Sequence, residues 1–276
     1  YKLKTIKDYL SFKNISLLLG VFCYFSCVGQ EIICKDNTKP SIEKEAIVIL
    51  PGFGDSKKGR NEQEKFFKEK GYDLFIPEYM DKFKVDNCVE NLHEFYDKNQ
   101  LKDYKKIHFF SYILGSWVLN KFINKYGVLN ISTIVYDRSP TQERAPYLAA
   151  ENLNLIISIM GIKKIMNDMA GLKYPPIENK DLDIGIIIES KATKLLRILE
   201  KKALEMGPLD YKLESLNQKT DDYLYTWLNH DQMYERFDVI GEEIFYFIEN
   251  HSFSNNAVRE QYNWNPFTNY KKEGLK

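Results

Sequence analysis

The 276-residue sequence predicts an α/β protein with a doubly wound, mostly parallel six-stranded sheet and a helical lid insertion. Two observations predict this class: short apolar runs recur along the chain, and amphipathic helical patterns separate them. The runs are mostly continuous rather than alternating, which is typical of strands buried on both faces of a parallel sheet. Alternation of such strands with helices favours right-handed βαβ units.

Six runs of strand length predict the sheet, and apolar residues at helical spacing predict the helices that cover it. The predicted strands are 46–50, 73–76, 107–110, 132–136, 184–188 and 223–228. The predicted helices outside the insertion are 61–70, 85–101, 115–126, 193–206 and 239–250.

One connection, between Tyr136 and Ile184, is too long for a plain crossover. It contains residues 150–172, where apolar residues at helical spacing predict one or two amphipathic helices. We expect this insertion, residues 138–183, to form a lid over a pocket. Ordinary packing of these helices on the sheet is the alternative.

The charge balance and the cysteines limit the classes of partner. The chain has 39 basic and 39 acidic side chains, so nothing global indicates a nucleic-acid partner. No CxxC pair with a matching histidine occurs, so we expect no zinc site. The glycine-rich segment 51–56 fails the GxxxxGK(S/T) spacing of a Walker loop, and we expect no metal and no cofactor. The chain has four cysteines, of which two lie within residues 1–30. The other two, Cys34 and Cys88, could form a disulfide, but their spacing leaves open whether they pair.

The N-terminus has the make-up of an export signal. Four lysines within residues 2–13 precede the apolar run 15–29, as in a secretory signal peptide or N-terminal anchor spanning residues 1–30. This run is short for a bilayer crossing, so we expect no integral membrane domain. We expect export to the periplasm, the cell envelope or the medium, with a cytoplasmic protein as the alternative. Residues 31–253 form the expected domain, followed by a polar tail, 254–276.

The first segment that could carry chemistry is PGFGDS, residues 51–56. A buried strand ends here in a glycine-rich turn, which allows the backbone to approach a ligand. The functional interpretation is half of an oxyanion hole, with the backbone N–H of Phe53 as a donor. The alternative is a simple strand–helix turn.

The second segment is SYILGS, residues 111–116. A nucleophile elbow needs small residues two positions before and two after its central residue. Ser111 and Gly115 satisfy this rule around Ile113, and Ser116 follows. Neither serine can be the centre, because bulky residues flank Ser111 while Ser116 lies within the helix. A β-branched residue at positive φ is strained by about 1–3 kcal/mol, so we expect Ile113 to have a negative φ.

The third segment is NHD, residues 229–231. His230 follows the last predicted strand, at the carboxyl edge of the sheet, where it could act as a general base. Asp137 and Glu189 each follow a strand at the same edge, and either could orient His230. A capping or exposed carboxylate is the alternative for both.

With these segments in place, residues 46–253 resemble the α/β-hydrolase superfamily, in its lipase- and esterase-like branch. PGFGDS is similar to the family's oxyanion loop, and SYILGS is similar to its nucleophile elbow, with Ile113 in place of the serine. The segment from His230 through the closing helix is similar to the family's histidine loop and final helix. The resemblance implies oxyanion donors at Phe53 and Leu114, and a triad acid at Asp137 or Glu189.

The expected function follows from Ile113, which has no lone pair with which to attack an ester. Loss of the nucleophile typically removes a factor on the order of 10⁶ in rate. We therefore expect a protein that has lost serine hydrolase activity and binds a hydrophobic small molecule, a lipid or a partner. The alternatives are an ester hydrolase that uses His230 without a serine, and a structural envelope protein with a collapsed pocket.

Overall fold

The computed structural model describes residues 30–178 and 181–268. The predicted signal or anchor, apart from Gln30, lies outside the described residues, as does the end of the polar tail. Among the described helices, none has both the length and the apolar character that a bilayer crossing requires.

All six predicted strands form, and the sheet has one more strand than predicted. Its order is β1-β3-β2-β4-β5-β6-β7, with β1 antiparallel to β3 and the other neighbours parallel. The additional strand, β1, is three residues long, below the length at which an apolar run is informative. The strands are β1 Ile32–Cys34, β2 Glu45–Leu50, β3 Asp73–Ile76, β4 Lys106–Ser111, β5 Ile131–Arg138, β6 Asp183–Lys191 and β7 Asp222–Asn229.

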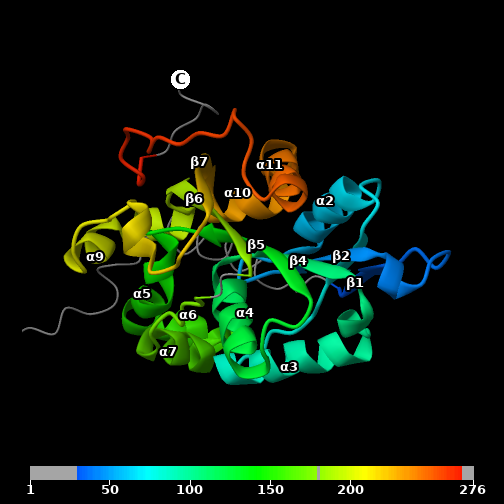
Figure 1. Ribbon diagram of the computed structural model, residues 1–276. Coiled ribbons are helices and arrows are strands. Elements are labelled where there is room, and N and C mark those ends of the chain that lie inside the picture. Colours follow the sequence, from blue (N-terminus) through cyan, green and yellow to red (C-terminus); the bar gives the residue numbers. More distant parts are fainter. Residues whose placement is uncertain (1–29, 179–180, 269–276) are drawn as a thin grey trace, which may run out of the picture.

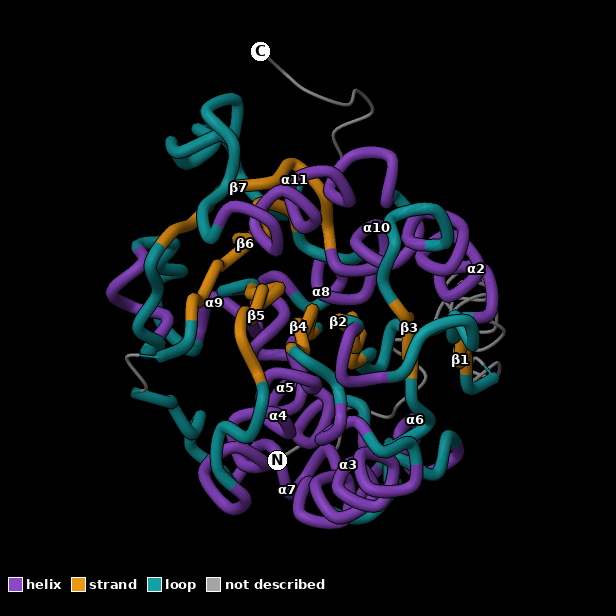
Figure 2. The backbone as a smooth tube through the Cα atoms, turned by 45° about the vertical axis from the view of Figure 1, so that its right-hand side comes forward, coloured by secondary structure: helices purple, strands orange, loops and turns teal. Residues whose placement is uncertain are grey.

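Helices cover both faces of this sheet (Figures 1 and 2). Helices α3, α4 and α7 pack on one face, and α2, α10 and α11 pack on the other. The α-helices of the described chain are α2 Lys57–Phe67, α3 Val85–Lys98, α4 Ile113–Tyr126, α5 Ala145–Asn152, α6 Asn154–Ile159, α7 Lys163–Gly171, α8 Lys194–Ile198, α9 Glu200–Glu205, α10 His230–Glu235 and α11 Phe237–Asn250.

Strand β2 shows why the predicted runs are continuous rather than alternating. Val48 and Leu50 belong to the core on the α3 and α4 side, whereas Ile47 and Ile49 belong to the core on the α2 and α11 side. All four side chains are fully buried. Because both faces of the sheet are covered, successive residues of a strand are apolar, as a parallel sheet requires.

Two helical regions are divided more finely than predicted. The insertion between β5 and β6 forms three short helices, α5 to α7, rather than one or two. The predicted helix 193–206 is split into α8 and α9 at Leu199, whose φ and ψ are −95° and 12°. Leu153 interrupts the helix between α5 and α6 in the same way, with φ and ψ of −122° and 27°.

The described part of the polar tail lies along the last strands of the sheet. The backbone N–H of Tyr225 in β7 donates to the carbonyl of Val258 at 2.8 Å. Further along, the indole N–H of Trp264 donates to the carbonyl of Ser190 at 2.9 Å, just beyond Glu189 in β6. The tail thus covers part of the edge that β7 would otherwise expose.

The two described cysteines are both free thiols. Cys34 lies in β1, where its Sγ is 3.4 Å from a carboxylate oxygen of Glu64. Cys88 is buried in α3, where the backbone N–H of Asp81 donates to its sulfur. The pairing that the sequence left open is therefore absent.

Candidate active site

Ile113 is the first residue of α4 and follows the end of β4 directly after Tyr112. It is not among the described non-glycine residues with positive φ, so the predicted relaxation of this turn is confirmed. The side chain is 6% exposed and lines a pocket, described below. An apolar group therefore occupies the position at which an elbow would present its nucleophile.

The small residues around Ile113 are required by backbone packing. A Cβ on Gly115 would lie 2.4 Å from the carbonyl oxygen of Leu50, so any larger residue would push α4 away from β2. Ser111 is fully buried, and its hydroxyl has no partner in the described chain. The hydroxyl of Ser116 donates to the carbonyl of Ile113 at 2.7 Å. Both serines thus lie inside the turn, away from a reactive position.

The glycine-rich turn 51–56 packs against Tyr234 of α10. The backbone N–H of Gly52 donates to the Tyr234 hydroxyl at 2.8 Å. A Cβ on Gly54 would lie 2.5 Å from the same ring. Tyr234 in turn stacks on Tyr112, with 3.8 Å between ring centroids. The two glycines therefore allow an aromatic pair to pack beneath the turn, a role the sequence did not indicate.

A buried ion pair fixes the other end of this turn. Arg60 in α2 donates from Nε and Nη2 to both carboxylate oxygens of Asp55, at 2.6–3.1 Å. Both side chains are 2% exposed, so the pair is shielded from water. Bidentate pairing gives a fixed geometry as well as attraction, and it holds the turn beside the start of α4.

His230 is the first residue of α10 and directly follows the end of β7. Asn229 caps this helix through its side chain, in a capping box with Gln232. His230 Nδ1 donates to Glu189 Oε1 at 2.7 Å, and Asp137 Oδ2 lies 3.3 Å from the same nitrogen. The structure thus brings both predicted acids to one side of one imidazole.

Burial gives this cluster unusual protonation behaviour. Both carboxylates are fully buried, and no hydrogen bond to either Asp137 oxygen or to Glu189 Oε2 occurs within the described residues. Burial and the charge of Asp137 raise the pKa of Glu189 well above its usual value. Burial lowers the pKa of His230, but the charge of Glu189 and the close contacts with both carboxylates outweigh burial and raise the pKa to about 10. The ring is therefore an imidazolium at neutral pH.

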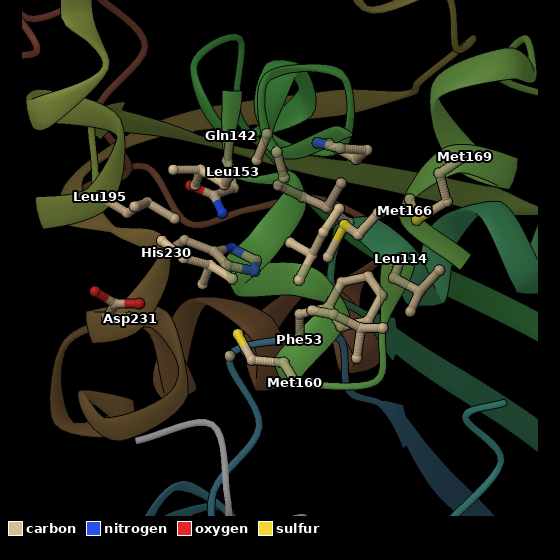
Figure 3. Close-up of a pocket in the computed structure, with 18 residues that line it drawn as sticks. Phe53, Leu114, Gln142, Leu153, Met160, Met166, Met169, Leu195, His230 and Asp231 are labelled. Carbon is tan, nitrogen blue, oxygen red and sulfur yellow. The ribbon is translucent and has the colours of Figure 1, made fainter. Parts of the chain in front are cut away.

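A pocket of about 100 Å³ lies between this cluster and the helices of the insertion. Figure 3 shows the His230 ring at one end, with Phe53, Leu114 and Met166 beyond it. The wall is almost entirely apolar. It is formed by Phe53, Gly54, Ile113, Leu114, Gln142, Ala145, Pro146, Ala149, Leu153, Ile156, Ile157, Met160, Ile162, Met166, Met169, Leu195, His230 and Asp231.

The polar groups that reach this pocket are mainly donors. The backbone N–H groups of Phe53 and Leu114, the expected oxyanion donors, form no hydrogen bond within the described residues. His230 Nε2 has no partner there either. The Gln142 amide accepts from Thr193 through Oε1 at 3.2 Å, which leaves its NH₂ group unpartnered in the same part of the chain. Gln142 was missed because nothing in its sequence neighbourhood indicates a site.

His230 and the two carboxylates behind its ring also have the composition of a metal site. Ligand atoms of Asp137, Glu189 and His230 all lie within 4.8 Å of one another. The 2.7 Å distance from Nδ1 to Glu189 is that of a charge-assisted hydrogen bond, which already accounts for this nitrogen. We therefore assign the group to a hydrogen-bonded cluster.

Comparisons with known proteins bear on the fold. No family model and no curated protein matches the chain. Several solved structures match over most of their length. A carboxylesterase of the thaumarchaeon Nitrososphaera gargenis is 8% identical with a TM-score of 0.52, covering 80% of this chain and 94% of the other.

Two bacterial enzymes give the same result. The bromoperoxidase from Bacillus anthracis is 11% identical with a TM-score of 0.50, covering 80% of this chain and 100% of the other. The lipase BlEst2 of Bacillus licheniformis is 14% identical with a TM-score of 0.50, covering 78% and 98%. The strand order and the elbow-like turn of this chain are thus accompanied by similarity to solved structures over most of its length, and all three observations indicate the same fold as in these enzymes.

Proposed function

We propose that this chain, which has the α/β-hydrolase fold, has lost serine hydrolase activity and instead binds a small apolar molecule. The ligand lies in the pocket beneath α5 to α7, which act as a lid. The observation that carries the proposal is Ile113, whose side chain lines the pocket beside His230 where an elbow would present a nucleophile.

The surroundings of Ile113 support loss of one group from an otherwise complete site. His230 retains two carboxylates, and the N–H groups of Phe53 and Leu114 remain without partners in the described chain. In serine hydrolysis, these groups would orient the base and stabilise the oxyanion. Without a nucleophile they have no covalent step to assist, but they still form one polar end of a binding pocket.

The pocket supports ligand binding over a purely structural role. It remains open despite the bulk of Ile113, and its walls are apolar. Three methionines of the lid region, Met160, Met166 and Met169, line it. Methionine is flexible and polarizable, so this wall can adapt to an apolar ligand.

The first test compares hydrolysis of short-chain nitrophenyl esters by wild type and Ile113→Ser, from pH 7 to 9. We expect wild type to remain at background, because Ile113 cannot form an acyl-enzyme. We expect the serine variant to exceed wild type by on the order of 10²-fold or more at pH 9, since the nucleophile accounts for much of the rate in such sites. The gain should fall about tenfold per pH unit towards pH 7, because His230, with a pKa raised to about 10, must lose its proton to activate the hydroxyl. Ile113→Ala is the matched control, because it enlarges the pocket without adding a hydroxyl.

Two outcomes of this assay count against the proposal. One is wild-type turnover well above background that disappears in His230→Gln, which would identify an active enzyme. The other is equal activity in the serine and alanine variants, which would show that pocket volume rather than a nucleophile had limited the reaction.

The second test measures binding of 1-hexanol by calorimetry. Met166→Trp fills the pocket and should abolish binding, while Ile198→Trp, at a position 59% exposed in α8, should leave binding unchanged. Equal binding by both variants would place the alcohol elsewhere and contradict the proposal.

The competing function is ester hydrolysis by a water molecule that His230 activates. The unpartnered Nε2 at the pocket favours it. The pKa of His230, raised to about 10, argues against it, because a general base must be unprotonated at working pH. Such an enzyme would gain activity about tenfold per pH unit between pH 7 and 9.

A further inference from the structure

We infer that the pocket is a receptor for a compact aliphatic monocarboxylate, bound as the anion. The carboxylate lies at the end formed by His230, Gln142 and the backbone of Phe53 and Leu114, and the hydrocarbon chain lies among the lid methionines. This inference rests on the proposed function and specifies its ligand class.

The first argument is the composition of the polar end. Phe53, Leu114, Gln142 and His230 line one pocket. Within the described chain, no partner is found for His230 Nε2, for the Gln142 NH₂ group or for the backbone N–H groups of Phe53 and Leu114. Figure 3 shows the amide nitrogen of Gln142 on the side facing the His230 ring. A carboxylate accepts hydrogen bonds through two oxygens and donates none, so it matches a set of donors.

The second argument is the direction of the imidazole. Nδ1 faces the buried oxygens of Glu189 and Asp137, at 2.7 and 3.3 Å, so this nitrogen carries a proton. His230 is 5% exposed, and its other nitrogen is left for the pocket. Two acids behind one ring favour the imidazolium, in which Nε2 is also a donor.

The start of α4 adds to the attraction for an anion. Leu114 is the second residue of this 14-residue helix, and Tyr112 provides no side-chain cap. The N-terminus of a helix attracts negative charge through its free N–H groups and its dipole. Together with the unpartnered Nε2 of buried His230, this helix end gives the head group two independent points of recognition.

The surrounding charges leave room for one anion. Burial and the charge of Asp137 raise the pKa of Glu189 well above its usual value, which lessens the negative charge behind the ring. Tyr112 and Tyr234, which lie against the His230 ring, stay neutral because burial raises both pKa values well above 10. Asp231 is the remaining acid in the pocket wall. Figure 3 shows it on the opposite side of the ring from Phe53 and Leu114.

The size of the pocket limits the chain length. Its volume of about 100 Å³ is smaller than the roughly 150 Å³ of an apolar cavity that holds benzene. A carboxylate with a chain of about three or four carbon atoms therefore fits without opening of the lid, and a six-carbon chain requires the flexible lid methionines to move. The apolar wall supplies no partner for a second charge, so dicarboxylates are excluded.

The experiment is calorimetric titration of the full chain with hexanoate, hexanamide and 1-hexanol at pH 7.5. The three probes share one chain length and differ in the charge and hydrogen bonding of the head group. We expect hexanoate to bind at least tenfold more tightly than hexanamide. His230→Gln should remove this preference, and Gln142→Leu should weaken hexanoate severalfold and 1-hexanol by a smaller factor, because the hydroxyl carries no charge.

The outcomes separate the two proposals. Binding of 1-hexanol or hexanamide as tight as that of hexanoate would overturn the carboxylate inference and leave the apolar pocket in place. Absence of binding by all three probes would overturn both. Because His230→Gln can disturb folding, Gln142→Leu decides independently: unchanged hexanoate affinity in this variant, with wild-type thermal stability, also overturns the inference.

Discussion

Two buried histidines lie at opposite ends of the parallel strands: His108 near the amino end of β4, and His230 beyond the carboxyl end of β7. Their environments differ. His108 in β4 is 1% exposed; its Nδ1 lies 2.7 Å from the Thr133 hydroxyl and its Nε2 lies 3.1 Å from Glu45. Burial lowers the pKa of His108, although the hydrogen bond to Glu45 opposes this effect. His230 is 5% exposed, has two acids at one nitrogen, and has a pKa raised to about 10.

This difference distinguishes a structural histidine from a site histidine. Both nitrogens of His108 are used within the fold, so the ring joins β4 to β5 and β2. Only Nδ1 of His230 contacts a carboxylate, and His230 also lines a pocket, where Nε2 is available to a ligand. Burial alone would not separate the two residues. The number of satisfied nitrogens and the number of facing carboxylates do.

The largest expected effect is on stability when His230 is removed. His230→Ala leaves Asp137 and Glu189 buried without a cation, and we expect the free energy of unfolding to fall by about 3–5 kcal/mol at pH 7. Urea denaturation measures this loss. The triple variant with Asp137→Asn and Glu189→Gln should recover most of it, because no buried charge remains. A loss below about 1 kcal/mol in the single variant would show that the cluster is not ionised.

The two histidines should shift stability with pH in opposite directions. The folded-state pKa of His230 lies above its unfolded value, so its stabilisation is complete below about pH 6.5 and is lost as pH rises towards 10. The folded-state pKa of His108 lies below its unfolded value, so its stabilisation is present above about pH 6.5 and is lost as pH falls. Each slope is at most about 1.4 kcal/mol per pH unit.

Unfolding of wild type, His230→Gln and His108→Gln between pH 5 and 9.5 measures both slopes. The difference between wild type and the His230 variant should shrink with rising pH, and that for the His108 variant should shrink with falling pH. Slopes of the same sign for both residues would show that the two imidazoles do not differ in the charge state that the fold stabilises.

The smallest expected effect concerns the partner of His108 in β5. Thr133→Val keeps the side-chain shape and removes the hydroxyl 2.7 Å from Nδ1, and we expect a loss of about 1 kcal/mol. Hexanoate binding should stay at the wild-type value, because Thr133 lies in the half of β5 remote from Asp137. A change in affinity would mean that the two edges of the sheet are coupled.

Much of the fold was predictable because its signals are local. A continuous apolar run such as 46–50 can be recognised without knowing its neighbours. The missed strand, Ile32–Cys34, is defined by pairing with β3 rather than by its own three residues. The break between α5 and α6 at Leu153 has no glycine or proline to mark it, so packing alone decides it.

The site was predictable in its members but not in its arrangement. His230, Asp137 and Glu189 each follow or end a strand, which placed them at one edge of the sheet. The choice between the two acids required the strand order: β5 and β6 are neighbours, and β7 follows β6. Both acids therefore reach His230, and the longer Glu189 side chain comes closer, at 2.7 against 3.3 Å.

The sequence by itself determined that residue 113 is isoleucine, flanked by the small residues of a tight turn, and hence that no serine can attack from that turn. Only the tertiary structure decided that two carboxylates share one imidazole and that Gln142 joins Phe53 and Leu114 around a pocket. The physical reason is that side-chain identity is a property of each position. Distances between residues such as Phe53 and His230 are set by the order and register in which strands pair.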